Sequence, residues 1–235
     1  MKRFFSFILA SAMILSLLPS ALTSMALESR TDAAEEIRLA SDETEYLSGT
    51  YSNGISWHLN LDTYHLTVTG SGDIPDDEDD WSGKRVETAF IGEGITSLKE
   101  GMFQNYASLT YIQLPQSLKK IGNSALYGTN ITGIQLPYGL TEIGSKAFYG
   151  CTKLTSITLP HTVTTIGDSA FYHTGISSMT FPDSVTSLGS SVLAHTKHLR
   201  SVKLPSGLEE LPSSFFQGCE VLRTVILPDT VTSIG

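Results

Sequence analysis

A phrase of 22 or 23 residues recurs along most of this chain of 235 residues, and it constrains the fold more than any other feature. Its clearest marker is a proline that returns in the same phase, at positions 115, 137, 160, 182, 205 and 228. Gly92 holds that phase one unit earlier. A fixed period in this range is typical of stacked coils, in which each unit is covered by its neighbours, and not of a globular enzyme core.

Apolar residues repeat in phase with the proline. When the proline is counted as position one, positions four, seven and twelve are apolar in every unit that reaches them. Before each proline, apolar and outward positions alternate with period two, which is typical of a short strand that the proline then ends. We therefore predict parallel strands stacked along one axis. They share one buried column, formed by Ile112, Ile134, Ile157, Met179, Val202 and Val225.

Two further columns predict the corners of the coil. Position eight is occupied by Gly122, Gly144, Gly167, Gly189 and Gly235. Because glycine tolerates unusual backbone angles, we interpret this column as a turn. Position fourteen is occupied by Asn105, Gly128, Gly150, His173, His195 and Gly218. These residue types tolerate a left-handed backbone, so a second corner is predicted there.

The repeated phrase reads Leu-x-x-Ile-x-Leu-Pro-x-x-Val-x-x-Ile-Gly-x-x-Ala-Phe-x-Gly-Cys, and the unit from Pro137 to Leu159 carries it almost whole. It resembles the BspA-like leucine-rich repeat family of bacterial surface and secreted proteins, over residues 92–235. The resemblance implies a β-rich solenoid, a right-handed coil with units of 22–23 residues and short parallel strands. Six full units and a truncated seventh are expected.

The segment before the repeats is also similar to a module that precedes such repeats in bacterial surface proteins. The similarity rests on Trp57-x-Leu59, Leu66-Thr-Val68 and Gly70-Ser-Gly72-Asp-Ile74. It implies that residues 46–91 form a small β-hairpin N-terminal cap on the first coil.

The two ends of the chain suggest export and a longer protein. Lys2 and Arg3 precede an apolar run, and Ser24-Met25-Ala26 follows it, as in a secretory signal peptide over residues 1–26. An uncleaved anchor helix is the alternative. Residues 27–45 are polar and charged, which indicates a flexible acidic leader. The chain stops at Gly235 without a polar capping repeat, so we interpret it as a fragment of a longer protein. A secreted or cell-surface location is expected.

Charge and cysteine usage exclude several classes of partner. The net charge of −9 is unevenly placed: residues 27–90 carry 15 acidic and 4 basic side chains, whereas residues 91–235 carry equal numbers of the two. The repeats therefore lack the basic surface that nucleic acid requires, and a membrane is a partner only during export. Cys151 and Cys219 lie three coils apart, about 14 Å at about 4.8 Å per coil. A disulfide needs Cα atoms within about 7 Å, so both thiols should be free, in a chain expected to be a monomer.

No motif predicts catalysis, and neither an enzymatic activity nor a cofactor is expected. His173, His195 and His198 have metal-like spacing. However, two of them take the corner that Gly and Asn take elsewhere, and no acidic residue is in phase to orient them, so no metal site is predicted. The acidic run Asp76–Asp80 lacks the spacing of a calcium loop and is interpreted as a solvated loop.

Two surfaces are candidates for binding. Tyr127, Tyr149 and Tyr172 share position thirteen and form either an outward aromatic stripe or a ladder packed beside the neighbouring phenylalanines. The outward strand positions offer the second surface, with Tyr111, Gln113, Gln135 and Thr158. The family resemblance implies adhesion, through an extracellular protein or glycan ligand. The alternative is a spacer or recognition arm of a larger surface enzyme, possibly glycan-active, with its catalytic domain beyond residue 235.

Overall fold

A computed structural model describes residues 45–76 and 81–235. The predicted signal peptide, all but one residue of the predicted leader and four residues of the acidic run lie outside the described residues. No helix among the described residues is long and apolar enough to cross a lipid bilayer.

The N-terminal part of the described chain is an antiparallel meander. Its strands are β1 (Tyr46–Thr50), β2 (Ser56–Asn60) and β3 (His65–Thr69). Trp57 lies opposite Val68, and Leu59 opposite Leu66. All four side chains are buried, as the alternation of the sequence predicts.

The turn between β2 and β3 is closed without glycine. The side-chain oxygen of Asn60 accepts hydrogen bonds from the backbone N–H groups of Asp62 and Thr63, at 2.9 and 2.8 Å. Tyr64 takes the left-handed conformation, with φ of 52°. An Asx-type turn thus replaces the more usual Asp-Gly turn.

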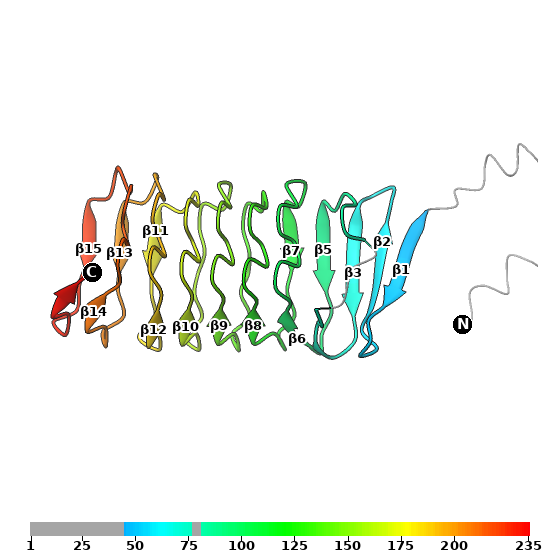
Figure 1. The fold of residues 1–235 in the computed structure, drawn as a ribbon, viewed down its shortest axis with the longest axis horizontal. Helices are drawn as coiled ribbons and strands as arrows, with labels where there is room; N and C mark the ends of the chain where they lie inside the picture. The colour runs from blue at the N-terminus through cyan, green and yellow to red at the C-terminus, as the bar shows by residue number, and fades with distance from the viewer. Residues whose placement is uncertain (1–44, 77–80) are drawn as a thin grey trace, which may run out of the picture. The chain divides into compact units, whose positions relative to one another are not determined.

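Strand β3 is also the first strand of the parallel row that runs along the coils. It pairs in parallel with β5 (Thr88–Ile91), and β5 pairs in parallel with β7 (Tyr111–Gln113). The same row of strands resumes further along the stack, with β11 (Ser178–Thr180), β13 (Ser201–Lys203) and β15 (Thr224–Ile226), again in parallel. We call this row, with the coil segments between β7 and β11, the strand face (Figure 1).

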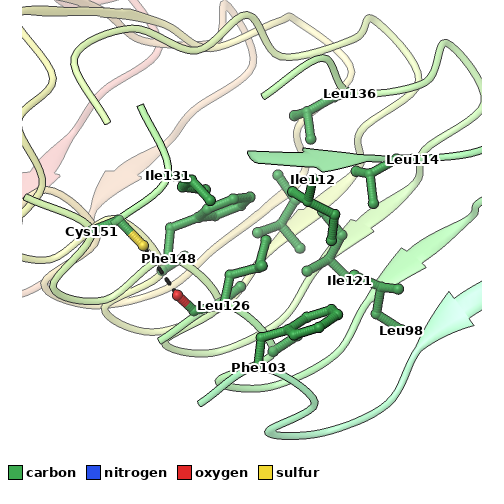
Figure 2. Packing of buried hydrophobic residues seen from close by; sticks show 14 of the residues in the cluster. Leu98, Phe103, Ile112, Leu114, Ile121, Leu126, Ile131, Leu136, Phe148 and Cys151 are labelled. Atoms are coloured by element: carbon green, nitrogen blue, oxygen red, sulfur yellow. Dashed lines mark hydrogen bonds between the residues drawn. The ribbon is translucent and has the colours of Figure 1, made fainter. Parts of the chain in front are cut away.

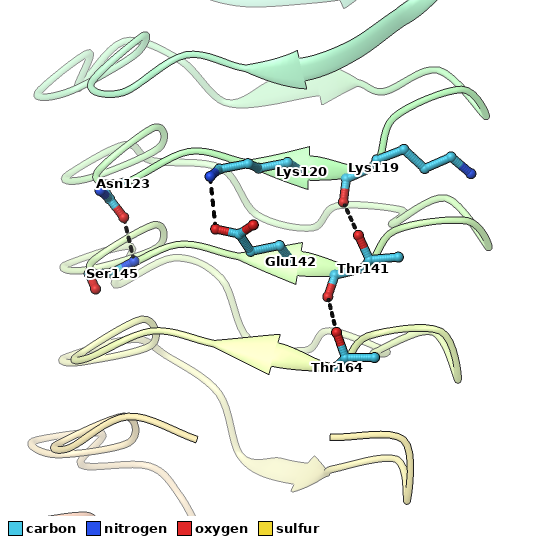
Figure 3. A network of polar contacts seen from close by, with 7 residues as sticks. All are labelled: Lys119, Lys120, Asn123, Thr141, Glu142, Ser145 and Thr164. Carbon is cyan, nitrogen blue, oxygen red and sulfur yellow. Dashed lines mark hydrogen bonds and ion pairs between the residues drawn. The ribbon is translucent and has the colours of Figure 1, made fainter. Parts of the chain in front are cut away.

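A second row of shorter strands follows the prolines. Its six-stranded parallel sheet consists of β4 (Gly72–Asp73), β6 (Ile95–Leu98), β8 (Lys120–Ile121), β9 (Glu142–Ile143), β10 (Thr165–Ile166) and β12 (Ser187–Leu188). A separate pair, β14 (Glu210–Leu211) and β16 (Ser233–Ile234), continues the row. Polar side chains reinforce it from coil to coil: the hydroxyl of Thr141 donates to Lys119 O, that of Thr164 donates to Thr141 O, and Lys120 pairs with Glu142 (Figure 3).

The third side of each coil is a row of tight turns. Position fourteen has positive φ in all six full units, from 55° at His173 to 72° at Gly150, so the predicted corner is confirmed. A second left-handed column, at position ten, was not predicted. It comprises Gly101, Ser124, Lys146, Ser169, Ser191 and Ser214.

Backbone hydrogen bonds between coils hold this strained row. The N–H of Leu126 donates to Ala147 O at 2.9 Å, and that of Phe148 donates to Ala170 O at 2.8 Å. A non-glycine residue in a left-handed conformation is uncommon and persists where its surroundings determine it. Here the stacking of the coils supplies those surroundings.

The position-eight glycines have a different role from the predicted one. Those of the second to fifth units lie outside the left-handed region. Instead, a Cβ at Gly122 would lie 2.6 Å from Leu98 O, and one at Gly167 would lie 2.4 Å from Ser145 N. At Gly122, Gly144, Gly167 and Gly189, the backbone of the preceding coil therefore passes too close for a side chain.

The core runs along the axis between the three rows. Phe103, Leu126 and Phe148 from position twelve meet Leu98 and Ile121 from position seven (Figure 2), and all five are buried. The predicted column before the prolines points inward throughout. Its buried members are Ile112, Met179 and Val202, and its half-buried members, packed against the core, are Ile134, Ile157 and Val225.

The expectation of an unbroken ladder on the strand face is wrong. Residues 131–136 and 154–159 follow the same path as their neighbours but form no strand, so β7 and β11 belong to different sheets. Gly133 stands where Tyr111 and Ser156 stand on the adjacent coils. Glycine has no side chain to pack against its neighbours and weakens a strand interior, which favours a break at this point.

Candidate ligand surfaces of the coil stack

Two adjoining grooves lie on the strand face, where the ladder is interrupted. The first has a volume of about 580 Å³ and includes Tyr111, Gln113, Gln116 and Thr132 in its lining. The second has a volume of about 440 Å³ and includes Tyr138, Ser156, Thr158 and Pro160. Both are lined by Gly133, Ile134 and Gln135, so they form one continuous depression.

The depression exists because side chains and backbone bonds are both missing there. A Cβ placed on Gly133 would meet no atom within 4 Å, so the position is an open notch. Half-buried Ile134 and Ile157 lie on the floor of the depression. Without ladder bonds, the backbone of these coils keeps hydrogen-bonding capacity that a ligand can use.

The structure brings all four predicted strand-face residues to this depression. Tyr111 is 54% exposed, and Gln113, Gln135 and Thr158 are exposed beside it. Sequence reasoning missed Tyr138, which is 71% exposed and lies in the second groove. Its signal was a lone aromatic residue directly after a proline, at a position that is polar in every other unit.

The groove lining carries no formal charge. It contains no Asp, Glu, Lys, Arg or His, only amides, hydroxyls, two tyrosines and apolar groups. Such a lining offers hydrogen bonds and apolar contact rather than electrostatic attraction. It also offers no nucleophile with a base beside it, which acyl transfer would need.

The tyrosine column is a stacked ladder on the turn row. The rings of Tyr127 and Tyr149 lie 4.7 Å apart at 3°, and those of Tyr149 and Tyr172 lie 4.5 Å apart at 3°. All three side chains are half-buried. Burial, followed by the two neighbouring phenols, raises the pKa of Tyr149 above its usual range. The rings therefore cover each other's faces and present edges and hydroxyls, which corresponds to the ladder alternative.

The histidines lie at the end of this column and do not form a cluster. The ring of His195 lies 5.0 Å from that of Tyr172 at 44°, and the backbone oxygen of His195 lies 3.4 Å from Nδ1 of His173. His198 is exposed on the following turn. Across residues 45–76 and 81–235, no three His, Cys, Asp or Glu side chains are placed to hold a metal ion.

Position fifteen forms a buried column of hydroxyls and thiols. The hydroxyl of Thr129 donates to Leu126 O at 3.0 Å. The thiol of Cys151 donates to the same oxygen at 3.1 Å (Figure 2). The thiol of Cys219 donates to Leu193 O at 3.1 Å. Both cysteines are free thiols. Burial raises the pKa of Cys151 to about 11, so this thiol stays protonated at neutral pH and is a poor nucleophile. The column holds the coils together and is not a reactive site.

Stacked coils of this length, with two rows of short parallel strands, define a leucine-rich repeat solenoid. The chain belongs to the BspA-type leucine-rich repeat family, whose repeat pattern matches residues 81–198 and 119–235 with six copies. Proteins of this class are typically scaffolds for protein interaction and not catalysts.

Solved structures have the same fold. A leucine-rich repeat protein from Eubacterium ventriosum superposes with a TM-score of 0.67 at 19% identity, over 81% of this chain and 62% of that one. The leucine-rich repeat protein of T. pallidum gives a TM-score of 0.63 at 27% identity, over 79% of this chain and 85% of that one. A leucine-rich repeat protein from Bacteroides ovatus gives a TM-score of 0.55 at 22% identity, over 83% of this chain and 54% of that one. No curated protein matches this chain.

Proposed function

We propose that this chain is a secreted or surface-displayed bacterial repeat protein that binds another macromolecule, an extracellular protein or a glycan, in the depression on its strand face. The observation that carries the proposal is the pair of adjoining, uncharged grooves across consecutive coils. Support for export comes from the basic and apolar residues at the N-terminus and from Ser24-Met25-Ala26. Adhesion to a host or neighbouring cell follows as the biological role.

The chemistry of the depression favours an extended, neutral ligand. Gln113 and Gln135 offer amide donors and acceptors on successive coils, and Thr158 adds a hydroxyl on the next. Tyr111 and Tyr138 are exposed aromatic groups, of the kind that often dominates the energy of an interface. A ligand that spans several coils makes one such contact per coil, which is how a solenoid builds an extended binding surface.

The test is to screen the 235-residue chain against a panel of extracellular-matrix proteins and glycans, with chromogenic hydrolase substrates in parallel. Saturable binding is expected, and the Gln113→Ala, Gln135→Ala double variant should weaken it about tenfold or more. The matched control is Gln104→Ala with Gln217→Ala, because these two glutamines are exposed on the turn row.

A second variant, Gly133→Ile, places an apolar side chain in the notch, where a Cβ meets no atom within 4 Å. It should abolish binding and leave the unfolding midpoint unchanged. If binding survives this variant but is lost when Tyr127, Tyr149 and Tyr172 are changed together to Ser, the turn row is the binding surface. Substrate hydrolysis that a single substitution abolishes would overturn the binding role in favour of catalysis.

A further inference from the structure

The row of short strands is interrupted between β12 and β14, and the interruption has a cause in the sequence. At the intact junction just before this interruption, three donors join the coil that begins at Pro182 to the coil before it. At position three, the hydroxyl of Ser184 donates to Val163 O at 2.7 Å. At position five, the N–H of Thr186 donates to Thr164 O at 3.0 Å. At position eight, the N–H of Gly189 donates to Ile166 O at 2.9 Å.

The coil that begins at Pro205 makes none of these three bonds. Gly207 has no hydroxyl to donate, as Gly139 has none in an intact coil, and the N–H of Glu209 makes no bond to the preceding coil. Pro212 stands at position eight, where it has no N–H to donate, and it carries a ring where Gly122, Gly144, Gly167 and Gly189 have no room for a Cβ. No hydrogen bond in the described part of the chain joins these three positions to the carbonyls of Val185, Thr186 and Leu188.

The other two sides of the same coil remain joined. On the strand face, Ser201 pairs with Thr224 and Val202 with Val225. On the turn row, Ser191 N donates to Ser213 O at 2.9 Å. The two coils therefore separate on one side only, and they leave a wedge-shaped cleft there.

This cleft has a volume of about 610 Å³, larger than either groove of the strand face. Leu188 and Leu208 lie in it half-buried, whereas Ile166 and Val163, at the same positions of an earlier coil, are fully buried. One wall carries the free carbonyls of β12, and the other carries the facing edge of β14. Unpaired strand edges are templates for an added extended chain.

The charged residues that line the cleft are all acidic. Its lining includes Asp183, Glu209 and Glu210, all exposed, and no Lys, Arg or His. Asp183 keeps its place because one of its carboxylate oxygens accepts from Ser206 N at 2.8 Å. A simple cation would use only the carboxylates, and it would leave the apolar floor and the two strand edges without a partner. The three carboxylates in turn disfavour an acidic or phosphate-bearing ligand.

We propose that this cleft binds an extended peptide segment that carries Lys or Arg. The segment donates backbone N–H groups to the carbonyls of Thr186 and Leu188 and lays an apolar side chain on Leu188 and Leu208. Its basic side chains pair with Glu209, Glu210 and Asp183. The site is independent of the strand-face depression, and it is acidic where the depression is uncharged.

The test uses the 235-residue chain and a fluorescent hexapeptide that alternates valine with lysine, followed by anisotropy. Saturable binding is expected. It should weaken about tenfold when Glu209→Gln and Glu210→Gln are combined, and it should weaken with added salt, because the contacts are electrostatic. The charge-matched control combines Glu100→Gln with Asp62→Asn, two exposed carboxylates outside the cleft, and it should leave binding unchanged. A peptide with glutamate in place of lysine should not bind.

Pro212→Gly is the decisive variant, because it restores the column glycine and its N–H. The amide at position 212 should then be protected from hydrogen exchange, the cleft should close, and peptide binding should be lost. Binding that persists in a protected Pro212→Gly variant overturns the proposal. So does equal binding of the lysine and glutamate peptides, or no binding by the parent chain. Loss of strand-face binding in Gly133→Ile leaves this result unaffected, so the two proposals fail separately.

Discussion

At the scale of single residues, the stack depends on glycines at positions where any side chain would clash with the preceding coil. The position-eight glycines touch the preceding coil through backbone atoms alone. Gly175 has the same constraint at one place in the loop, since a Cβ there would lie 2.4 Å from Thr152 O. By contrast, Gly133 and Gly207 have open space beside them. A glycine count therefore predicts little until the neighbouring coil is placed.

Gly167→Ala should lower the free energy of unfolding by about 2–3 kcal/mol, because its Cβ must displace backbone atoms at 2.4 Å. Gly207→Ala is the matched control, and it should be neutral or slightly stabilising, since a residue with fewer unfolded conformations replaces glycine without a clash. Urea unfolding of both variants measures the difference. Equal effects would contradict the close-approach explanation.

The buried thiol predicts an alkaline limit on stability. Burial raises the pKa of Cys151 from 9.0 to about 11, so the folded state holds its proton more tightly than the unfolded state. The stabilisation is complete below about pH 9 and is lost as the pH rises through about 11, which amounts to roughly 2–3 kcal/mol. Cys151→Thr, the residue found in this column at positions 129, 174 and 196, should remove that part of the pH dependence. Identical slopes for the two proteins in urea unfolding would exclude this account.

At the scale of elements, the N-terminal meander and the repeats share one sheet. Strand β3 is antiparallel to β2 and parallel to β5, with Leu66 beside Ala89. The meander thus supplies the ladder partner that the first coil would otherwise lack. Trp57 anchors it, since its indole lies so close to Gly49 that a Cβ there would be 2.7 Å away.

Trp57→Ala should lower the unfolding free energy of the meander and the repeats together, by about 3–5 kcal/mol, because a buried aromatic side chain is lost from a shared sheet. His58→Ala, an exposed neighbour on the same strand, is the control and should have little effect. A single shifted transition in calorimetry is expected. Two transitions, with the main one unmoved, would mean that the meander folds as an independent appendage.

At the scale of the whole molecule, two surfaces of different electrostatic character result from two interruptions in the ladders. The strand-face depression is uncharged, and the cleft at Pro212 is acidic. Binding to the depression should therefore change less than about threefold across the range of salt concentrations that strongly weakens peptide binding in the cleft. Titrations of both ligands at low and high salt test this, and a steep salt dependence for the strand-face ligand would contradict the proposed recognition by neutral groups.

The repeat by itself determined most of the fold. Period, proline phase and apolar columns specified stacked coils, the inward column before each proline and the corner at position fourteen, because each depends on one local pattern repeated in every unit. The burial of Trp57, Leu59, Leu66 and Val68 followed from alternation in the same way, whereas the register of Trp57 against Val68 came from the structure. The outward positions of the strand face, Tyr111, Gln113, Gln135 and Thr158, could also be read from that period.

The tertiary structure decided what depends on contact between one coil and the next. The left-handed column at position ten, the stacking of the tyrosine rings, the break at Gly133 and the cleft at Pro212 each require the height and spacing of neighbouring backbones. Pro212 stands at an aligned glycine position in the sequence, but its effect appears only when the preceding coil is in place. A pattern within one unit cannot encode those distances, since a single coil has no stable structure until its neighbours cover it.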